Sequence, residues 1–216
     1  MTPMNILDKS AVLFDFDGVI ADTEMGILSY MEKVYARYGI RLTDEEKMSY
    51  IGTDGRELTK SILQKAGVNK SVEEFMEEKR QSGNFYEDSP DLKAMPGVKD
   101  FLQYLKAADL KIGLVSSTST KLIITALNRL HLMGMQDVII CGDMVAHKKP
   151  SPECYLKAMA FLNVKPQECV IIEDSPTGIR AGKAAGSYVI AFKGGSILQD
   201  TSEADEEWMD YSHKIK

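Results

Sequence analysis

Two aspartates follow a short apolar run near the start of the chain. Asp15 and Asp17 are separated by one residue in the sequence DFDGV, directly after Ala11–Phe14. A regular strand would point both side chains the same way, and Gly18 permits a sharp turn at this place. Two neighbouring carboxylates repel each other, so the pair is unfavourable unless a cation or a catalytic role compensates. A solvated pair of turn aspartates is the alternative.

A second acidic pair, Glu173 and Asp174, ends the apolar run Cys169–Ile172. Because parallel strands end along one edge of a sheet, Asp174 is expected to meet Asp15 and Asp17 there. Three hard carboxylate oxygens at one edge make a magnesium site. The alternative is that Asp174 only caps the helix that follows.

Hydroxyl and amine groups follow in two further segments. Ser116 and Ser117 come directly after the run Lys111–Val115, and Lys148 and Lys149 precede a proline. Hydroxyls and backbone N–H groups at a strand end and helix start form an anion site. A lysine there can balance both the carboxylates and a phosphate. The alternatives are ordinary helix caps and solvated lysines.

The elements that would position these groups alternate between strand and helix. The apolar runs are unbroken, which is typical of parallel strands buried on both faces. The alternation predicts an α/β fold with a doubly wound, parallel, Rossmann-like sheet. The expected strands are Ala11–Phe14, Lys111–Val115, Asp137–Cys141, Cys169–Ile172 and Tyr188–Phe192, and the expected helices cover residues 97–108, 119–131, 151–163 and 176–186.

Helical periodicity alone covers the segment between the first two expected strands. We therefore expect a small helical cap domain, residues 20–90, inserted into an α/β core of residues 1–19 and 91–216. Two capping boxes, Thr43 to Glu46 and Ser71 to Glu74, mark the starts of helices in the insert. Gly67 and Gly83 are placed as C-caps at helix ends.

The composition limits the partners. The chain has 216 residues, and its net charge of −6 disfavours nucleic acid or an anionic membrane surface. No apolar run has the length of a membrane span. A small molecule is the expected partner, and no obligate protein partner is evident.

The cysteines and the two ends of the chain give further expectations. Three scattered cysteines predict reduced, buried thiols. Together with an N-terminus that has no signal-peptide pattern, they predict a cytoplasmic location. The acidic segment 202–210 is expected to be solvated, with Trp208 as its anchor.

The four segments, in this order, resemble the motif set of the haloacid dehalogenase superfamily. The helical insert after the first strand resembles the cap of its beta-phosphoglucomutase-like branch. The resemblance spans essentially the whole chain, and the ordered set of motifs is highly specific. It implies a magnesium-dependent phosphatase that acts on a small phosphorylated metabolite, such as a sugar phosphate.

The resemblance assigns roles to the acidic residues. Asp15 matches the nucleophile that forms an aspartyl phosphate, and Asp17 matches the general acid and base. Asp17 also argues against haloacid dehalogenation, where the family lacks this acid. Mg²⁺ would be held by Asp15, the backbone carbonyl of Asp17, and Asp174, with Glu173 as an outer or water-mediated contributor.

The remaining site residues are also implied by the resemblance. Ser116, with the amide of Ser117, matches the phosphate-binding motif, and Lys149, rather than Lys148, matches the family lysine. In the cap, three positions are expected to face the substrate: Thr23, Gly52 and Arg56. Arg56 as a solvated helix residue is the alternative.

Two departures separate this chain from the mutases of the branch. Mutases carry a histidine and a lysine in the cap where this chain has Ile27 and Ile51. Their replacement favours hydrolysis, and a sugar-phosphate mutase is the second hypothesis.

A phospho-aspartate receiver, which is a signalling domain and not an enzyme, is the third hypothesis. The insert, the chain length and Asp17 argue against it. A relative that binds without catalysis is a fourth, although every expected catalytic position is filled.

Overall fold

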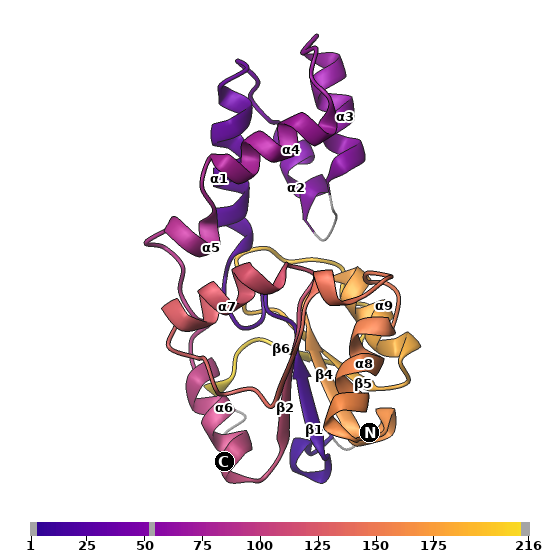
Figure 1. The fold of residues 1–216 in the computed structure, drawn as a ribbon. Helices are drawn as coiled ribbons and strands as arrows, with labels where there is room; N and C mark the ends of the chain where they lie inside the picture. Colours follow the sequence, from indigo (N-terminus) through magenta and orange to yellow (C-terminus); the bar gives the residue numbers. More distant parts are fainter. Residues whose placement is uncertain (1–3, 52–54, 213–216) are drawn as a thin grey trace. The chain divides into compact units, whose positions relative to one another are not determined.

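Unbroken apolar runs form most strands of one parallel sheet, as the sequence predicts. The structure is a computed structural model that describes residues 4–51 and 55–212. Within these residues, six strands lie side by side in the order β3-β2-β1-β4-β5-β6 (Figure 1). Their bounds are Ala11–Phe14 for β1, Lys111–Val115 for β2, Val138–Ile140 for β3, Cys169–Glu173 for β4, Tyr188–Phe192 for β5 and Glu206–Trp208 for β6.

The chain divides into two units. One consists of Met1–Asp22 and Leu92–Lys216 and contains the sheet, and the other is Thr23–Asp91. The helical unit thus starts and ends within a few residues of the expected insert boundaries.

Helices cover both faces of the sheet. Helices α8 and α9 contact each other, with α8 over β1 to β3 and α9 over β4 and β5, while α6 packs on β2 from the opposite face (Figure 1). The helices of this unit are α6 (Val98–Ala107), α7 (Thr120–Arg129), α8 (Glu153–Leu162) and α9 (Pro176–Ala184), with single 3₁₀ turns at Ile6–Asp8, Gly142–Met144 and Pro166–Glu168. The predicted fold class is therefore confirmed.

The central strand β1 supplies apolar side chains to both faces. Leu13 belongs to the same buried cluster as Tyr155 and Ile179, which lie on α8 and α9. Phe14 points to the other face and packs edge-on against Phe101 of α6, with ring centroids 6.1 Å apart. Alternation along β1 thus ties both helical layers to the strand that carries Asp15.

The acidic segment near the C-terminus contains a strand that the sequence did not predict. Glu206–Trp208 forms strand β6, which pairs with β5, and Trp208 is only 4% exposed. The Trp208 ring lies edge-on to Phe101, with centroids 5.7 Å apart. Burial of this indole anchors the segment at the sheet edge, as expected, while the side chains of Glu203, Asp205 and Glu207 remain exposed to solvent.

The helical unit consists of short helices packed around aromatic side chains. Its helices are α1 (Glu24–Ala36), α2 (Asp44–Tyr50), α3 (Arg56–Lys65), α4 (Val72–Gln81) and α5 (Phe85–Asp88). Both predicted capping boxes are confirmed, since Thr43 and Ser71 accept N–H groups of the glutamates three residues on, which in turn accept the cap N–H groups. Its core includes Tyr35 and Phe75, whose ring centroids lie 4.6 Å apart.

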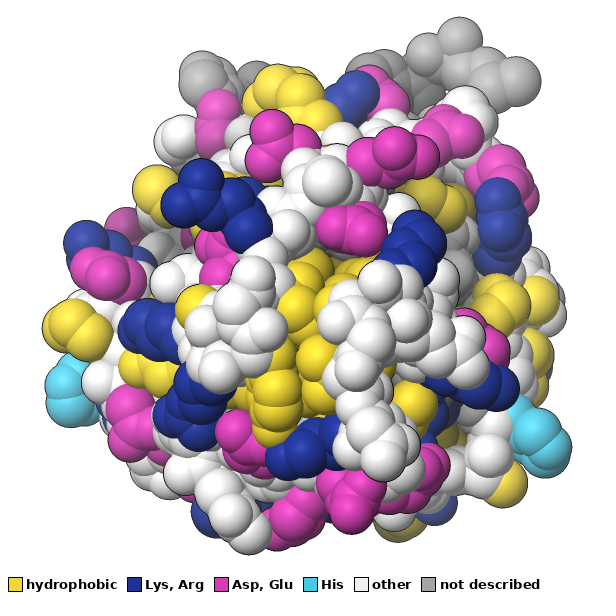
Figure 2. Space-filling model, turned by 90° about the horizontal axis from the view of Figure 1, so that it is seen from above, with side chains coloured by type: hydrophobic (Ala, Val, Ile, Leu, Met, Phe, Trp, Pro, Cys, Tyr) yellow, Lys and Arg dark blue, Asp and Glu magenta, His cyan; other side chains and the backbone are white. Residues whose placement is uncertain are grey.

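Charged side chains of both signs are interspersed over the face that Figure 2 shows. On that face, among the described residues, basic side chains do not gather into a continuous surface. Every helix in the described part of the chain is too short or too polar to cross a lipid bilayer.

Candidate active site

A tight turn after β1 carries the two aspartates. Asp15 continues the sheet by donating its N–H to Ile172 at 2.9 Å. The chain then turns, and the N–H of Gly18 donates to the carbonyl of Ala21 at 2.9 Å. Gly18 has φ 74°, and a Cβ there would lie 2.1 Å from Asp174 Oδ2. Only glycine allows both the left-handed backbone and the close approach of Asp174.

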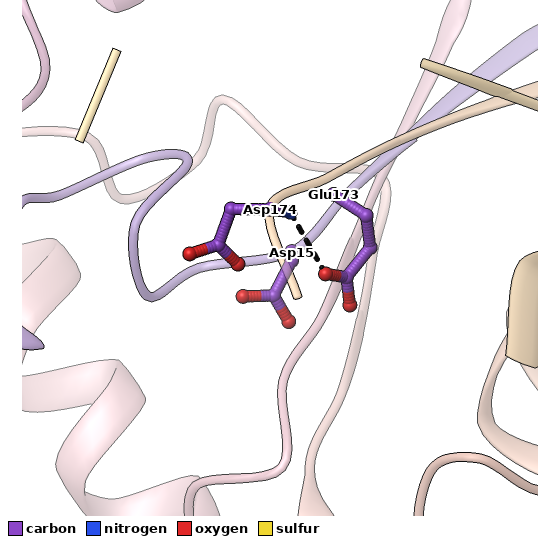
Figure 3. A group of neighbouring side chains, drawn as sticks. All are labelled: Asp15, Glu173 and Asp174. Carbon is purple, nitrogen blue, oxygen red and sulfur yellow. Dashed lines mark hydrogen bonds between the residues drawn. The ribbon is translucent and has the colours of Figure 1, made fainter. Parts of the chain in front are cut away.

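The carboxylates of Asp15, Glu173 and Asp174 converge at the carboxyl ends of β1 and β4 (Figure 3). Each offers one oxygen, and these oxygens lie within 4.8 Å of one another. All three residues are buried, with exposed fractions of 7%, 0% and 7%. Strands β1 and β4 are neighbours in register, which explains why residues far apart in sequence meet here.

Lys149 is the cation of this cluster. Its Nζ donates to Asp15 Oδ1 at 2.5 Å, to Glu173 Oε1 at 2.6 Å and to the carbonyl of Val115 at 3.2 Å. The lysine side chain is only 5% exposed, whereas Lys148 points to solvent. The buried ammonium therefore has partners for all three of its protons.

These contacts shift the pKa values of the cluster. Burial raises the pKa of Asp15 well above its ordinary value, against the lowering effect of Lys149. Burial alone would lower the pKa of Lys149, but the charges of Asp15 and Glu173 hold it well above its ordinary value. The pKa of Glu173 is lowered, because Lys149 and Ser175 outweigh the effect of burial. The site thus holds Glu173 and Lys149 ionised and leaves Asp15 short of positive charge.

Glu173 is fully occupied by donors from the protein. Its Oε1 accepts from Lys149 and from the hydroxyl of Tyr155 at 3.0 Å. Its Oε2 accepts from the N–H groups of Asp174 and Ser175 and from the Ser175 hydroxyl, at 2.9, 3.0 and 3.0 Å. Two carboxylate oxygens offer about four lone-pair sites. Although Glu173 belongs to the acidic group, its oxygens are used to hold Lys149 and the start of α9.

The donor set left over suits a hard divalent cation. Asp15 and Asp174 supply carboxylate oxygens, which Mg²⁺ prefers, and the raised pKa of Asp15 is what an added positive charge would reverse. Ser175, not Asp174, is the N-cap of α9, because its hydroxyl accepts the N–H of Gly178 at 3.1 Å. The helix-cap alternative for Asp174 is therefore excluded.

The loop after β2 brings hydroxyl groups to the same edge. Ser116 is 2% exposed, and its Oγ accepts the N–H of Thr118 at 3.0 Å. That contact leaves the Ser116 hydroxyl proton for another acceptor. Ser117 is exposed, and the Thr118 hydroxyl donates to Asp17 Oδ2 at 3.2 Å. The predicted phosphate loop and the second aspartate are thus directly linked.

The three expected cap residues lie in the helical unit or outside the described residues. Thr23 is buried and directly precedes α1. Gly52 falls in the segment 52–54, outside the described residues. Arg56 opens α3, is about half exposed, and pairs with Glu73 at 3.2 Å. Arg56 and Glu73 both line a hollow of about 440 Å³ within the helical unit.

Several residues at the site carry contacts that the sequence reasoning missed. Tyr155 supports Glu173 and also places its ring 4.9 Å from Lys149 Nζ. Gln199 donates to Asp174 Oδ2 at 3.4 Å, and the buried Tyr211 hydroxyl donates to the carbonyl of Val19 at 3.0 Å. Tyr155 lies among apolar residues of α8, so the sequence signals only a core aromatic.

Known proteins are similar to this chain along most of its length. A family model described as haloacid dehalogenase-like hydrolase matches residues 12–192. A phosphorylated carbohydrates phosphatase of Thermotoga maritima is 35% identical over 180 residues, which is 82% of this chain and 81% of the relative. The beta-phosphoglucomutase of Bacillus subtilis is 30% identical over 220 residues, covering 93% of this chain and 96% of the relative.

Solved structures agree with these relatives. The crystal structure of beta-phosphoglucomutase from Clostridium difficile has a TM-score of 0.76 and 28% identity, covering 95% of this chain and 92% of that one. A family model that matches most of the chain, and relatives of 30% identity or more along at least four-fifths of it, lead to one conclusion: this chain belongs to the haloacid dehalogenase-like hydrolase family.

Proposed function

We propose that this chain is a magnesium-dependent phosphatase that removes phosphate from a small phosphorylated carbohydrate through an aspartyl phosphate on Asp15. The observation that carries the proposal is the convergence of Asp15, Asp174, Lys149 and Ser116 at the carboxyl edge of the sheet. Acid, cation and hydroxyl groups meet there where the fold binds ligands.

In the first step, an oxygen of Asp15 attacks phosphorus. The bond between phosphorus and the ester oxygen breaks, and Asp17 gives its proton to the departing alkoxide. Lys149, already bonded to Asp15 Oδ1, orients the nucleophile and offsets charge on the transferred group. The Ser116 hydroxyl donates to a phosphoryl oxygen.

In the second step, water attacks the aspartyl phosphate. Asp17, now ionised, takes a proton from the water, and the bond between phosphorus and the Asp15 oxygen breaks. Inorganic phosphate leaves, and Asp15 returns as a carboxylate. Atoms and protons balance, because Asp17 ends the cycle in its starting state.

Mg²⁺ would be held by Asp15, Asp174 and the backbone carbonyl of Asp17. When bound, the ion supplies positive charge that stabilises the phosphoryl oxygens and keeps the nucleophile ionised. Glu173 serves this arrangement by fixing Lys149, which its five protein donors support.

The proposed substrate class follows from the relatives. The Thermotoga maritima relative is a phosphatase of phosphorylated carbohydrates. A relative from Aquifex aeolicus, 32% identical over 179 residues, is a phosphoglycolate phosphatase. The proposed partner is a small molecule, with no part for nucleic acid, a membrane or an obligate protein partner.

The proposed location is the cytoplasm. Three free, buried thiols support it, because reduced cysteines are typical of that compartment.

The test measures phosphate release from a panel of sugar and short-chain alkyl phosphates, with Mg²⁺ and with a chelator. We expect release only with Mg²⁺, and a fall of at least roughly a thousandfold in Asp15→Asn. Asp109→Asn is the matched control, because Asp109 is exposed and has φ 59°, which asparagine adopts equally well. Full activity of Asp15→Asn would contradict the proposal.

A mutase is the second candidate, because two relatives described above are beta-phosphoglucomutases. Incubation with beta-glucose 1-phosphate and a bisphosphate primer separates the two. Net phosphate release supports the phosphatase, as the isoleucines at positions 27 and 51 suggest. Formation of glucose 6-phosphate without phosphate loss supports the mutase.

A further inference from the structure

Thr118 contacts both the proposed phosphate-binding residue Ser116 and the proposed general acid Asp17. Its N–H donates to Ser116 Oγ at 3.0 Å, and its hydroxyl donates to Asp17 Oδ2 at 3.2 Å. Its carbonyl accepts the N–H of Gly142 at 2.9 Å. One residue therefore contacts the phosphate-binding hydroxyl, the second aspartate and the neighbouring strand end.

The backbone around Thr118 is held firmly. Ser116 donates its N–H to Ile140 at 3.0 Å, which anchors the loop to β3. A Cβ at Gly142 would lie 2.1 Å from the carbonyl oxygen of Ser117, so these two backbones are in close contact. A loop fixed at both points gives the Thr118 hydroxyl a defined position.

Asp17 needs such a partner. The last torsion of an aspartate side chain is broad, so its carboxylate is not fixed by rotamer preference alone. A hydrogen bond from a neighbouring hydroxyl to one carboxyl oxygen removes this freedom and fixes the plane of the carboxyl group. The contact of the Thr118 hydroxyl with Oδ2 therefore sets the orientation of the whole Asp17 carboxyl group.

We propose that Thr118 is a positioning residue for Asp17: its hydroxyl holds the Asp17 carboxyl group in the orientation that serves the leaving oxygen of the substrate. The proposal rests on the proposed phosphatase function. Thr118 touches neither phosphorus nor the nucleophile in this assignment. Its loss should therefore impair proton transfer while phosphate binding stays intact.

The test compares esters with different leaving groups. An alkyl phosphate needs a proton on its leaving oxygen, whereas 4-nitrophenyl phosphate has a stable leaving anion and needs little help. We expect Thr118→Val to lower kcat/KM for the alkyl ester by about 10- to 100-fold and for the aryl ester by less than about threefold. Inhibition by inorganic phosphate should not change.

Three controls isolate the hydroxyl. Thr118→Ser keeps it and should return kcat/KM for the alkyl ester to within about threefold of the unmodified protein. Thr120→Val removes the hydroxyl that bonds Asp143 at the start of α7, two residues on, and should leave the kcat/KM of both esters unaffected. In an Asp17→Asn background, Thr118→Val should change the alkyl-ester kcat/KM by less than about twofold, because the two residues act as one unit.

Other outcomes would overturn the inference. Equal losses on both esters, weaker phosphate inhibition, or no recovery in Thr118→Ser would assign Thr118 to phosphate binding or to folding. An unimpaired Thr118→Val in an active enzyme would overturn this inference alone. An unmodified protein that releases phosphate from neither ester would contradict the proposed function and this inference with it.

Discussion

Two glutamates, one in each unit, are held by several donors in very different surroundings. Glu173 accepts five hydrogen bonds and has a side chain that is 1% exposed. Glu78 of the helical unit bonds Lys70 at 2.6 Å and the Tyr38 hydroxyl, and it lies 3.5 Å from Arg37. Its side chain is 25% exposed.

Both carboxylates have lowered pKa values, for different reasons. Hydrogen bonds from Lys70 and Tyr38 lower the pKa of Glu78 to about 2. The Glu78 side chain is partly exposed, so water also reaches it. Glu173 stays ionised against the effect of burial, because Lys149 and Ser175 compensate for it. A buried anion depends on every partner, whereas water can replace a lost partner at the surface. Loss of a partner should therefore cost more stability at Glu173 than at Glu78.

The largest effect is expected for Lys149→Met. Removing the ammonium leaves Asp15 and Glu173 as buried, adjacent acids, so the free energy of unfolding should fall by about 3–5 kcal/mol. Phosphate release should fall by at least roughly a thousandfold, because the nucleophile loses its orienting cation. Urea unfolding and a phosphate assay measure the two effects.

Lys148→Met is the matched control, because this neighbouring lysine is exposed. It should change the free energy of unfolding by less than about 0.5 kcal/mol and leave phosphate release intact. Similar losses in both variants would show that the positive charge of the segment, not the buried contact, is what matters.

Glu173→Gln is expected to rank second, with a fall of about 2–4 kcal/mol in the free energy of unfolding at pH 7. The amide NH₂ faces groups that all donate, so at least one contact becomes repulsive. Because the pKa of Glu173 is lowered from 4.5, its contribution is complete above about pH 5 and is lost as the pH falls through its folded value.

The difference between Glu173→Gln and the unmodified protein should therefore shrink on acidification below pH 4.5. Urea unfolding across a pH series measures it. A difference that grows in acid would mean that Glu173 is protonated in the folded protein at neutral pH.

Tyr155→Phe should have a moderate effect. It removes one donor to Glu173 but keeps the ring beside Lys149, so we expect a loss of about 1 kcal/mol and a fall in phosphate release of less than about tenfold. Tyr188→Phe, which removes a hydroxyl that donates to Glu206 at 3.3 Å near the surface, is the control. A loss as large as that of Glu173→Gln would assign Tyr155 a direct part in the chemistry.

The smallest effect is expected for Glu78→Gln. The melting temperature should fall less than in Tyr155→Phe, phosphate release should persist, and the difference should shrink in about 1 M salt, where the screening length falls to about 3 Å. Glu77→Gln, which breaks an exposed pair with Arg80, is the matched neighbour. A salt-independent loss comparable to that of Glu173→Gln would end the distinction between the two glutamates.

The fold was largely predictable because its signals are local. Strands such as Ala11–Phe14 are unbroken apolar runs, and the capping boxes at Thr43 and Ser71 have a fixed spacing. The strand Glu206–Trp208 was not predicted, because three residues of acidic composition carry no strand period. Its pairing depends on the burial of Trp208, which is a tertiary effect.

The site was predictable where chemistry follows a strand end. Asp15, Asp174 and Ser116 directly follow β1, β4 and β2, so topology alone brings them to one edge. Contacts made from the interior of another element leave no such signal. Tyr155 reaches Glu173 from the buried face of α8, and the choice between Lys148 and Lys149 depends on which side chain turns inward.

The position of β1 between β2 and β4 has a consequence for synthesis of the protein. Asp15 is made well before Asp174, and the two can meet only after β4 has been made and paired with β1. A nascent or prematurely ended chain that stops before residue 173 lacks Glu173 and Asp174, two of the three acids of the cluster. A chain that ends ahead of β4 is therefore expected to lack the metal site of the proposed phosphatase.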